Sequence, residues 1–279
     1  MGLYMYHRLD VKSQEIRLLT LLPGAFDNNL RIQITHVPFF PPDEPPNLYE
    51  PRIQKLQQTL PEGWLVYETT EGRFIFKEKA SGKTYWSHPD PGFDMDRYNN
   101  HLRDSLRLDV GQTKYEALSY TWGSSEGPYN IYVEKTGGIA AVGSTDDCSI
   151  LPVQRNLEAA LRHLRSDQES RILWIDALCI NQDDLEERSE QVGRMKNIYK
   201  HAHRVVVWLG PEENNSGLAI DTLQFLGEQV VITQDNISLA SPTACQRDWH
   251  IPRLEMPYDQ KTWNAVDHLA ARPWFGRLW

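Results

Sequence analysis

The sequence predicts an α/β protein with a mainly parallel sheet and flanking helices, together with a separate small antiparallel sheet. Two runs, at 172–175 and 205–209, are unbroken apolar stretches, as is typical of strands buried on both faces. Apolar residues recur at helical spacing in 156–164 and again after residue 185. Strands alternating with helices imply βαβ crossovers and parallel pairing, so we expect the two apolar runs to be adjacent central strands.

The remaining elements follow from local signals. Asp184 and Glu187 resemble a capping pair at the start of a helix, whereas 230–258 shows no sustained period and is predicted to be loop. Residues 30–35 alternate cleanly, which predicts a half-buried strand. The other predicted elements are a strand at 115–120, helices from Leu185 and at 262–271, and a further helix that Ser216 can cap.

Composition divides the chain into four parts. A proline-rich stretch at 38–46 favours extended polyproline II, and we interpret 41–59 as a linker that separates residues 1–40 from the rest. Residues 60–90 contain three short aromatic runs between turn residues, which predicts a three-stranded meander. The α/β pattern occupies 112–279.

Charge and cysteine usage exclude several functions. The chain of 279 residues has 29 basic and 38 acidic residues and a net charge of −9, which disfavours binding to nucleic acid or an anionic membrane surface. No apolar run approaches the ~20 residues that span a bilayer, and no signal peptide is readable at the N-terminus. Three scattered cysteines suit a reducing compartment, so a cytoplasmic location is expected.

Two carboxylates are the candidate catalytic groups. Asp176 follows a predicted buried strand, at the edge where open α/β sheets bind ligands. It either contacts a ligand such as a ribose or caps the turn at 179–181. Glu187 lies on a helix whose charged residues are expected to be solvated, and it needs a pocket to act as a base. Cys179 is either a nucleophile or an inert core residue, and the sequence favours the core because no histidine is nearby.

Four residues are candidates for lining a pocket: Tyr120, Trp122, Asn181 and Gln182. Trp122 either walls a pocket or seals the end of the sheet. The amides before residue 185 could attract an anion, but the acidic residues there are explained by capping. No metal site is predicted because paired Cys/His spacing is lacking, and neither phosphate-loop, dinucleotide nor serine-hydrolase motifs occur.

Residues 60–89 resemble a WW domain. Trp64, Phe76 and Pro89 match the structural buckle of that family. The corresponding peptide-binding face is made of Ile75, Lys79, Thr84 and Trp86. Thr84 and Trp86 match the family, but Ile75 replaces a tyrosine that would stack on proline and Lys79 replaces a histidine. The face is therefore either a proline-peptide receptor or a packing surface.

The rest of the chain resembles the heterokaryon incompatibility (HET) domain of filamentous fungi. The resemblance is carried by the blocks at 115–123, 151–157, 173–182, 207–210 and 272–275. Residues 1–40 resemble the usual lead-in of such proteins, which makes 41–100 an insertion into the HET region. The resemblance implies a distant relation to TIR domains, and hence a doubly wound, flavodoxin-like sheet.

The same resemblance implies a role in fungal allorecognition, as an effector or signalling domain that triggers programmed cell death through TIR-like assembly. Some TIR domains cleave NAD with a glutamate, so an NAD hydrolase is the alternative, with NAD as substrate and no cofactor. The counterpart of that glutamate is expected shortly after Trp279, which implies that the HET domain continues past this residue. A second alternative is an adaptor that binds protein partners through the WW-like face.

The partners implied are proteins, including a second copy of the chain, and a proline-rich peptide. Pro45 and Pro46 precede the WW-like segment in the same chain. Because tethering raises effective concentration, we hypothesise that this chain's own proline segment partly covers Trp86.

Overall fold

The computed structural model describes residues 1–41, 49–96, 98, 113–123, 127–135, 148–246 and 258–277. The chain forms two compact units, each assembled from separate stretches of sequence. Unit 1 comprises Met1–Pro42, Gly111–Pro211 and Arg272–Trp279, and unit 2 comprises Asp43–Val110 and Glu212–Ala271.

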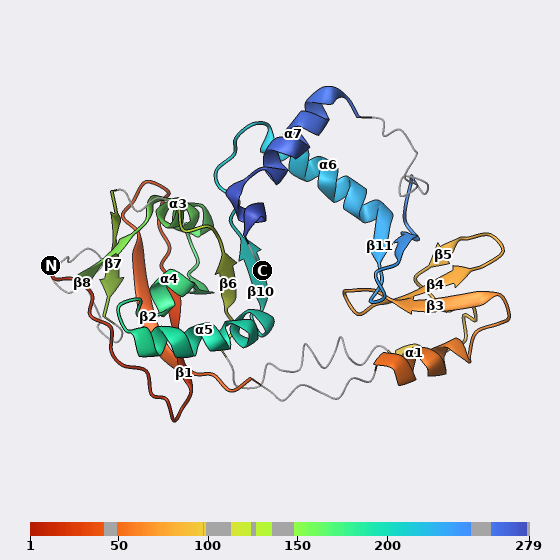
Figure 1. Cartoon of the computed structure of the whole chain (residues 1–279), viewed down its shortest axis with the longest axis horizontal. Helices are drawn as coiled ribbons and strands as arrows, with labels where there is room; N and C mark the ends of the chain where they lie inside the picture. Colours follow the sequence, from red (N-terminus) through yellow and green to blue (C-terminus); the bar gives the residue numbers. More distant parts are fainter. Residues whose placement is uncertain are drawn as a thin grey trace. The chain divides into compact units, whose positions relative to one another are not determined.

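Unit 1 is built on a seven-stranded sheet with the strand order β10-β6-β9-β1-β2-β7-β8 (Figure 1). The strands are β1 (Glu15–Leu21), β2 (Arg31–Pro38), β6 (Glu116–Ser119), β7 (Tyr129–Glu134), β8 (Cys148–Val153), β9 (Arg171–Trp174) and β10 (Arg204–Val207). The pairs β10–β6, β6–β9 and β2–β7 are parallel. The pairs β9–β1, β1–β2 and β7–β8 are antiparallel.

The predicted α/β fold is thus confirmed, and the three neighbouring strands β10, β6 and β9 are parallel to one another. The sheet as a whole is mixed, because the N-terminal β1–β2 hairpin pairs with β9 in the antiparallel sense. A hairpin needs only a short turn, whereas each parallel pair needs a long crossover. The separate three-stranded antiparallel sheet is also present, in unit 2.

The two apolar runs are not neighbours, which corrects the prediction that they are adjacent central strands. β6 lies between β9 and β10, and β10 is the last strand of the sheet order. Val205 and Val207 of β10 remain 46% and 41% exposed. An unbroken apolar run does not distinguish a central strand from an edge strand whose side chains are only partly covered.

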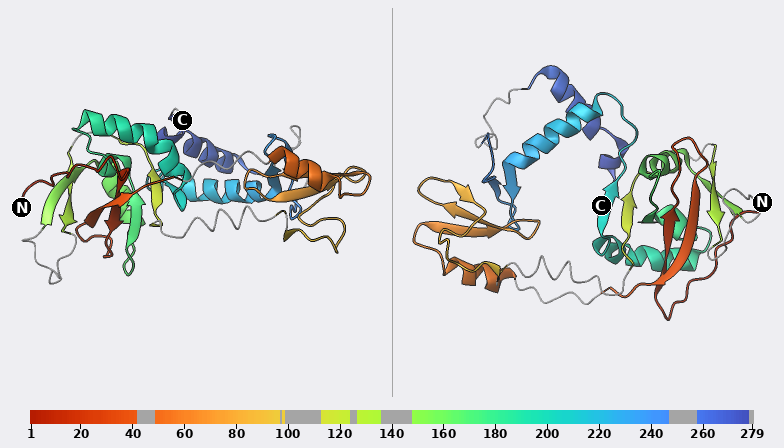
Figure 2. Two further views of the ribbon diagram at one scale, coloured as in Figure 1. Left: turned by 90° about the horizontal axis from the view of Figure 1, so that it is seen from below. Right: turned by 180° about the vertical axis from the view of Figure 1, so that it is seen from behind.

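The helices of unit 1 are α3 (Arg155–Leu164), α4 (Asp176–Cys179), α5 (Leu185–Lys200) and the short 3₁₀ helix η1 (Pro273–Gly276). α5 lies against one face of the sheet (Figure 2), where Ile198 and Tyr199 pack with the fully buried Trp174. Asp184 caps α5 by accepting hydrogen bonds from the amides of Glu186 and Glu187. The expected reciprocal bond from the Glu187 side chain is absent, because that carboxylate is engaged elsewhere.

Unit 2 contains α1 (Tyr49–Gln57), β3 (Trp64–Glu68), β4 (Phe74–Glu78), β5 (Thr84–Tyr85), α6 (Ser216–Gln229), β11 (Val230–Ile232), β12 (Ser238–Ala240) and α7 (Gln260–Ala270). α1 falls within the predicted linker at 41–59. The hairpin β11–β12 corrects the expectation of loop at 230–258, because strands of three residues are too short to show a period. Asn215, in a left-handed conformation, takes the N-cap position of α6 that we expected for Ser216.

The three-stranded sheet β3-β4-β5 buries side chains on both faces. On one face, Phe74 and Phe76 pack with Leu56 of α1. On the other, Ile75 packs with Val231 and Leu239 of the β11–β12 hairpin. A sheet of this size is only marginally stable alone. The packing of α1 on one face and of the β11–β12 hairpin on the other supplies the buried apolar area that it lacks.

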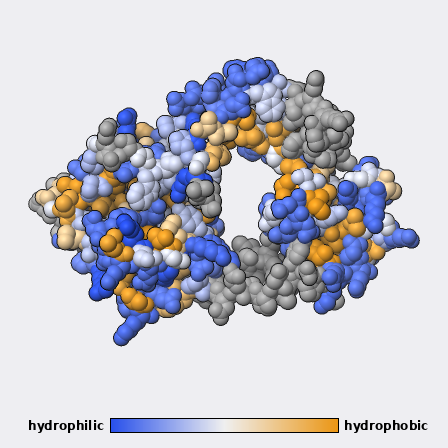
Figure 3. Space-filling model, in the orientation of Figure 1, coloured by the Kyte–Doolittle hydropathy of each residue, from blue (hydrophilic) through white to orange (hydrophobic). Residues whose placement is uncertain are grey.

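Hydrophobic and hydrophilic side chains are interleaved over both units on the face seen in Figure 3. Among the residues that the structure describes, no helix combines the length and the apolar character needed to cross a bilayer.

Candidate functional site

The strongest candidate site lies at the carboxyl ends of the parallel strands β6, β9 and β10. The chain leaves these strands at Tyr120, Ile175 and Trp208 respectively. The amide of Trp208 donates to the carbonyl of Ser119, which keeps the β10 and β6 exits side by side. Ligands of open α/β sheets bind at this edge because the strand exits and the following helix starts present polar groups there.

Asp176 is the acidic group of this edge. Its Oδ2 accepts a 3.1 Å hydrogen bond from Nε1 of Trp122, and its Oδ1 accepts a 2.8 Å bond from the amide of Ala177. Burial raises the pKa of this carboxyl, while the bonds from Trp122 and Ala177 and the positive charge of Arg277 lower it. The raised pKa means that the hydrogen bonds do not offset the cost of desolvating the carboxylate.

Three of the four predicted pocket residues gather around Asp176. Trp122 is 43% exposed and offers an aromatic surface beside the carboxylate. Tyr120 is buried, and its pKa is raised by burial and further by the charge of Asp176. The side-chain amide of Gln182 donates to the carbonyl oxygen of Asp176 over 2.9 Å and fixes the backbone there. The side chain of Asn181 instead accepts from the amide of Asp183.

Several residues of this edge were not assigned to it from the sequence. Arg277 donates to the carbonyl of Tyr120, and Nε1 of Trp274 donates to Oγ of Ser119 over 3.0 Å. Asn156 bridges two strand exits, since its amide donates to the carbonyl of Thr121 and its Oδ1 accepts from Nε1 of Trp208. These partners lie 35 to 157 residues apart in sequence, so no local pattern could pair them.

Glu187 has a structural role that the sequence did not indicate. Its carboxylate receives two bonds from Arg17, at 2.5 and 2.9 Å, and its side chain is only 8% exposed. Arg17 also donates to the carbonyls of His7 and Cys179. The expected solvated position of Glu187 is therefore wrong, because a buried bidentate pair holds it against β1.

The turn at 179–181 is capped by Glu187, whose Oε1 accepts from the amide of Asn181 over 2.7 Å. This corrects the alternative in which Asp176 caps that turn. Asp176 is thereby left to bond Ala177 and the indole of Trp122.

Cys179 is an inert core residue. Its side chain is 2% exposed, and burial raises the pKa of the thiol to about 12. A thiol with this pKa forms almost no thiolate at neutral pH and is not an activated nucleophile. Within the described part of the chain, no group of three or more His, Cys, Asp or Glu residues could hold a metal ion.

A second candidate site lies on the three-stranded sheet. Thr84 and Ile75 are buried on the face of the sheet that packs against the β11–β12 hairpin. Trp86 is partly buried on the same face. Lys79 follows β4 and is exposed. The guanidinium of Arg73 lies 3.8 Å from the centre of the Trp86 ring, so a cation covers one surface of the indole.

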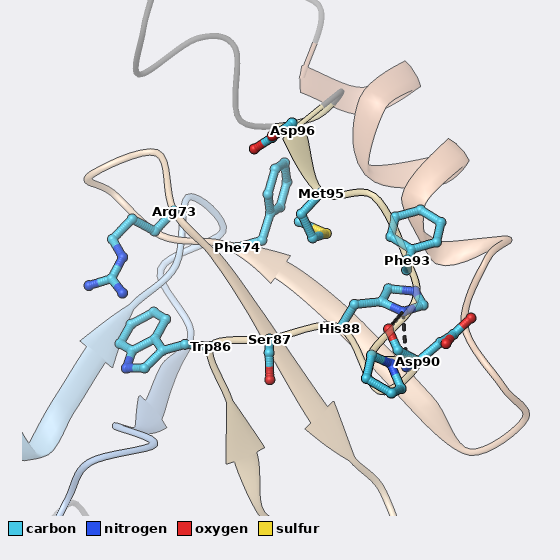
Figure 4. Close-up of a pocket in the computed structure, with 10 residues that line it drawn as sticks. Arg73, Phe74, Trp86, Ser87, His88, Asp90, Phe93, Met95 and Asp96 are labelled. Carbon is cyan, nitrogen blue, oxygen red and sulfur yellow. Dashed lines mark hydrogen bonds between the residues drawn. The ribbon is translucent and has the colours of Figure 1, made fainter.

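Arg73 and Trp86 form one end of a pocket of about 540 Å³ (Figure 4). His88 lies at the other end, stacked on Phe93 with ring centres 4.0 Å apart, and its Nδ1 accepts from the amide of Asp90. The pocket is further lined by Phe74, Ser87, Pro91, Met95 and Asp96.

Comparison with protein families identifies residues 115–279 as matching the heterokaryon incompatibility protein (HET) family. The match covers more than half of the chain. The chain belongs to the HET family. Its HET region includes the strand exits around Asp176 as well as α6, the β11–β12 hairpin and α7, whereas the β1–β2 hairpin and the three-stranded sheet precede it.

A curated relative supports the same assignment. The HET chain is 42% identical over 122 residues to heterokaryon incompatibility protein 6, OR allele, of Neurospora crassa. This alignment covers 41% of the HET chain and 17% of the relative. No solved structure matches the chain.

Proposed function

We propose that the HET region is an effector or signalling domain of fungal allorecognition, which triggers programmed cell death by TIR-like assembly. The observation that carries the proposal is the HET match over 115–279, within which the strand exits converge on Asp176. The name of the Neurospora relative, a heterokaryon incompatibility protein, supports the same role. The aligned segment makes up only 17% of that relative. The activity of the whole protein is therefore part of the proposal.

Assembly is supported by the edge strand β10. Within the described residues, one side of β10 pairs with β6 and the other side has no strand partner. A strand edge of this kind carries backbone donors and acceptors that can pair with another chain. The exposed Val205 and Val207 add apolar area beside that edge.

The test is expression of the chain in a filamentous fungus with measurement of cell viability. We expect the native chain to reduce viability and Val207→Lys to restore it, because a lysine on an edge strand opposes strand pairing. Gly193→Lys, on the exposed surface of α5, is the matched control and is expected to remain toxic. Size-exclusion chromatography of the same proteins reports whether toxicity follows assembly. A Val207→Lys chain that stays toxic but no longer assembles contradicts the assembly mechanism, and one that assembles normally shows that β10 is not the assembling edge.

A second candidate, cleavage of NAD, is favoured by the environment of Asp176. A partly buried carboxylate beside an exposed indole can stabilise the positive charge that develops on a ribose when its bond to nicotinamide breaks. Nicotinamide leaves with the electron pair of the broken bond, the oxygen of a water molecule bonds to the ribose carbon, and that water releases one proton to solvent. This proposal requires that NAD fall in expressing cells and that Asp176→Asn prevent the fall.

Asp183→Asn is the control for the NAD measurement, because Asp183 is an exposed carboxylate seven residues away. Reduced viability with an unchanged NAD level favours assembly alone. Loss of NAD in the native chain and in Asp183→Asn, but not in Asp176→Asn, favours the hydrolase.

A further inference from the structure

The three-stranded sheet and the β11–β12 hairpin are far apart in sequence but are joined by backbone hydrogen bonds. Thr69, directly after β3, forms an antiparallel bridge with Thr233. The amide of Thr70 donates to the carbonyl of Ile232 over 3.0 Å, and the amide of Gln234 donates to the carbonyl of Glu68 over 2.8 Å. Both threonines of the bridge are fully buried, so this pairing is part of the interior of unit 2.

Side chains continue the contact across the face of the sheet. Ile75 of β4 is fully buried against Val231 and Leu239, one from each strand of the hairpin. Thr84 of β5 donates to the carbonyl of Ala240 over 2.7 Å and is itself buried. The hairpin therefore meets β4 and β5 with aliphatic side chains and offers a carbonyl to the hydroxyl of Thr84.

The residues that depart from a proline-binding face are explained by this contact. An isoleucine at position 75 packs between two aliphatic side chains, where a tyrosine would add volume to a site that is already filled. Arg73 stacks on Trp86 and covers part of the indole that a proline ring would need. The covering segment is the hairpin, whereas Pro45 and Pro46, which we expected to cover Trp86, lie outside the described residues.

We propose that the three-stranded sheet is an internal docking module whose ligand is the β11–β12 hairpin of the HET region. It recognises a β-hairpin with aliphatic residues at paired positions, and it is not a receptor for proline-rich peptides of other proteins. The module thereby fastens the inserted segment to the HET-matched half of unit 2.

The test uses hydrogen exchange on the full chain, read at the amides of Thr70 and Gln234. Leu239→Asp places a charge in the buried contact, and we expect exchange at both amides to rise together by about tenfold or more. The matched control is Ile237→Asp, because Ile237 is 40% exposed in the same hairpin, and it is expected to leave both rates unchanged. The proposal is overturned if Leu239→Asp accelerates Gln234 alone, since the two segments would then open independently.

A milder variant covers the case in which Leu239→Asp unfolds the chain. Thr84→Val keeps the shape of the side chain and removes its bond to Ala240, so exchange at both amides is expected to rise about fivefold. Exchange of the β1–β9 amides in unit 1 is expected to stay constant. Unchanged exchange at Thr70 in Thr84→Val overturns the proposal.

Peptide binding provides the second readout. A fluorescein-labelled peptide containing Pro-Pro-Pro-Tyr is titrated against the native chain and followed by anisotropy. We expect no saturable binding up to about 1 mM, because the face is already occupied. Saturable binding that Trp86→Ala abolishes overturns the proposal in favour of an external receptor.

Discussion

Two carboxylates, one shortly after β9 and one in the first turn of α5, have contrasting environments. Glu187 is held by a bidentate bond from Arg17 and by the amide of Asn181. Asp176 accepts one indole and one amide hydrogen bond, and its pKa is raised by burial. The first carboxylate is fully compensated, whereas the second is not.

This difference distinguishes Glu187, which stabilises the fold, from Asp176, which is a candidate ligand-binding group. A compensated buried charge fixes the chain locally but has no remaining capacity for a ligand. An undercompensated carboxylate next to an exposed aromatic ring is stabilised by any cationic or hydrogen-bonding ligand that reaches it. Four measurements test this difference between the two carboxylates.

The largest effect is expected at Glu187. Glu187→Gln leaves the buried guanidinium of Arg17 without its counter-charge, and we expect a loss of about 3–5 kcal/mol in the free energy of unfolding. Urea denaturation measures this loss. The control is Glu186→Gln, because Glu186 pairs with Arg8 at 3.8 Å in an exposed position. An effect no larger than that of the control would show that Glu187 is not architectural.

The next effect is expected at Asp184, which caps the helix that carries Glu187. Asp184→Ala removes the acceptor of two backbone amides and should lower the free energy of unfolding by about 1 kcal/mol. Asp184→Ser retains a capping oxygen and should recover most of the loss. If alanine and serine behave alike, helix capping does not contribute to holding Glu187.

Replacing Asp176 is expected to raise stability, whereas replacing Glu187 or Asp184 lowers it. Because the pKa of Asp176 is raised in the folded state, the native chain loses stability as the pH rises from the usual aspartate range through the folded pKa. Asp176→Asn should abolish this decline and raise the melting temperature slightly at neutral pH. Melting curves across pH test this, and a lower melting temperature of the asparagine variant at neutral pH would contradict it.

The smallest effect concerns the indole that bonds Asp176. Trp122→Phe keeps an aromatic ring but removes the Nε1 donor, which lowers the pKa of this carboxyl in the native chain. The pKa of Asp176 should therefore rise further, as measured by carboxyl-carbon NMR titration. An unchanged pKa would mean that the hydrogen bond does not influence the carboxylate.

Local patterns predicted two of the longer helices, one in each unit. The helix expected at 156–164 is α3 and the helix expected at 262–271 is α7, because long periodic segments reveal their buried face. Of the four residues predicted to line a pocket, the structure places Tyr120, Trp122 and Gln182 around Asp176, whereas the side chain of Asn181 bonds the amide of Asp183.

Long-range pairings could not be predicted in the same way. The partnership of Arg17 with Glu187 spans 170 residues, and the sequence around Glu187 resembles that of any charged helix start. The order of β6 between β9 and β10 depends on how crossovers pack, which an apolar run does not encode. The hairpin that covers Ile75 was missed because its strands have only three residues each.

The discontinuous make-up of unit 1 has a consequence for synthesis on the ribosome. Ser119, at the end of β6, bonds Trp274, which is translated 155 residues later. At 5–20 residues per second this interval lasts roughly 8 to 30 s. During that time the carboxyl end of the sheet lacks Trp274 and Arg277, so a nascent chain carries an unfinished Asp176 edge. Any toxicity that depends on this edge would begin only after Trp274 and Arg277 have left the ribosome and reached the end of the sheet.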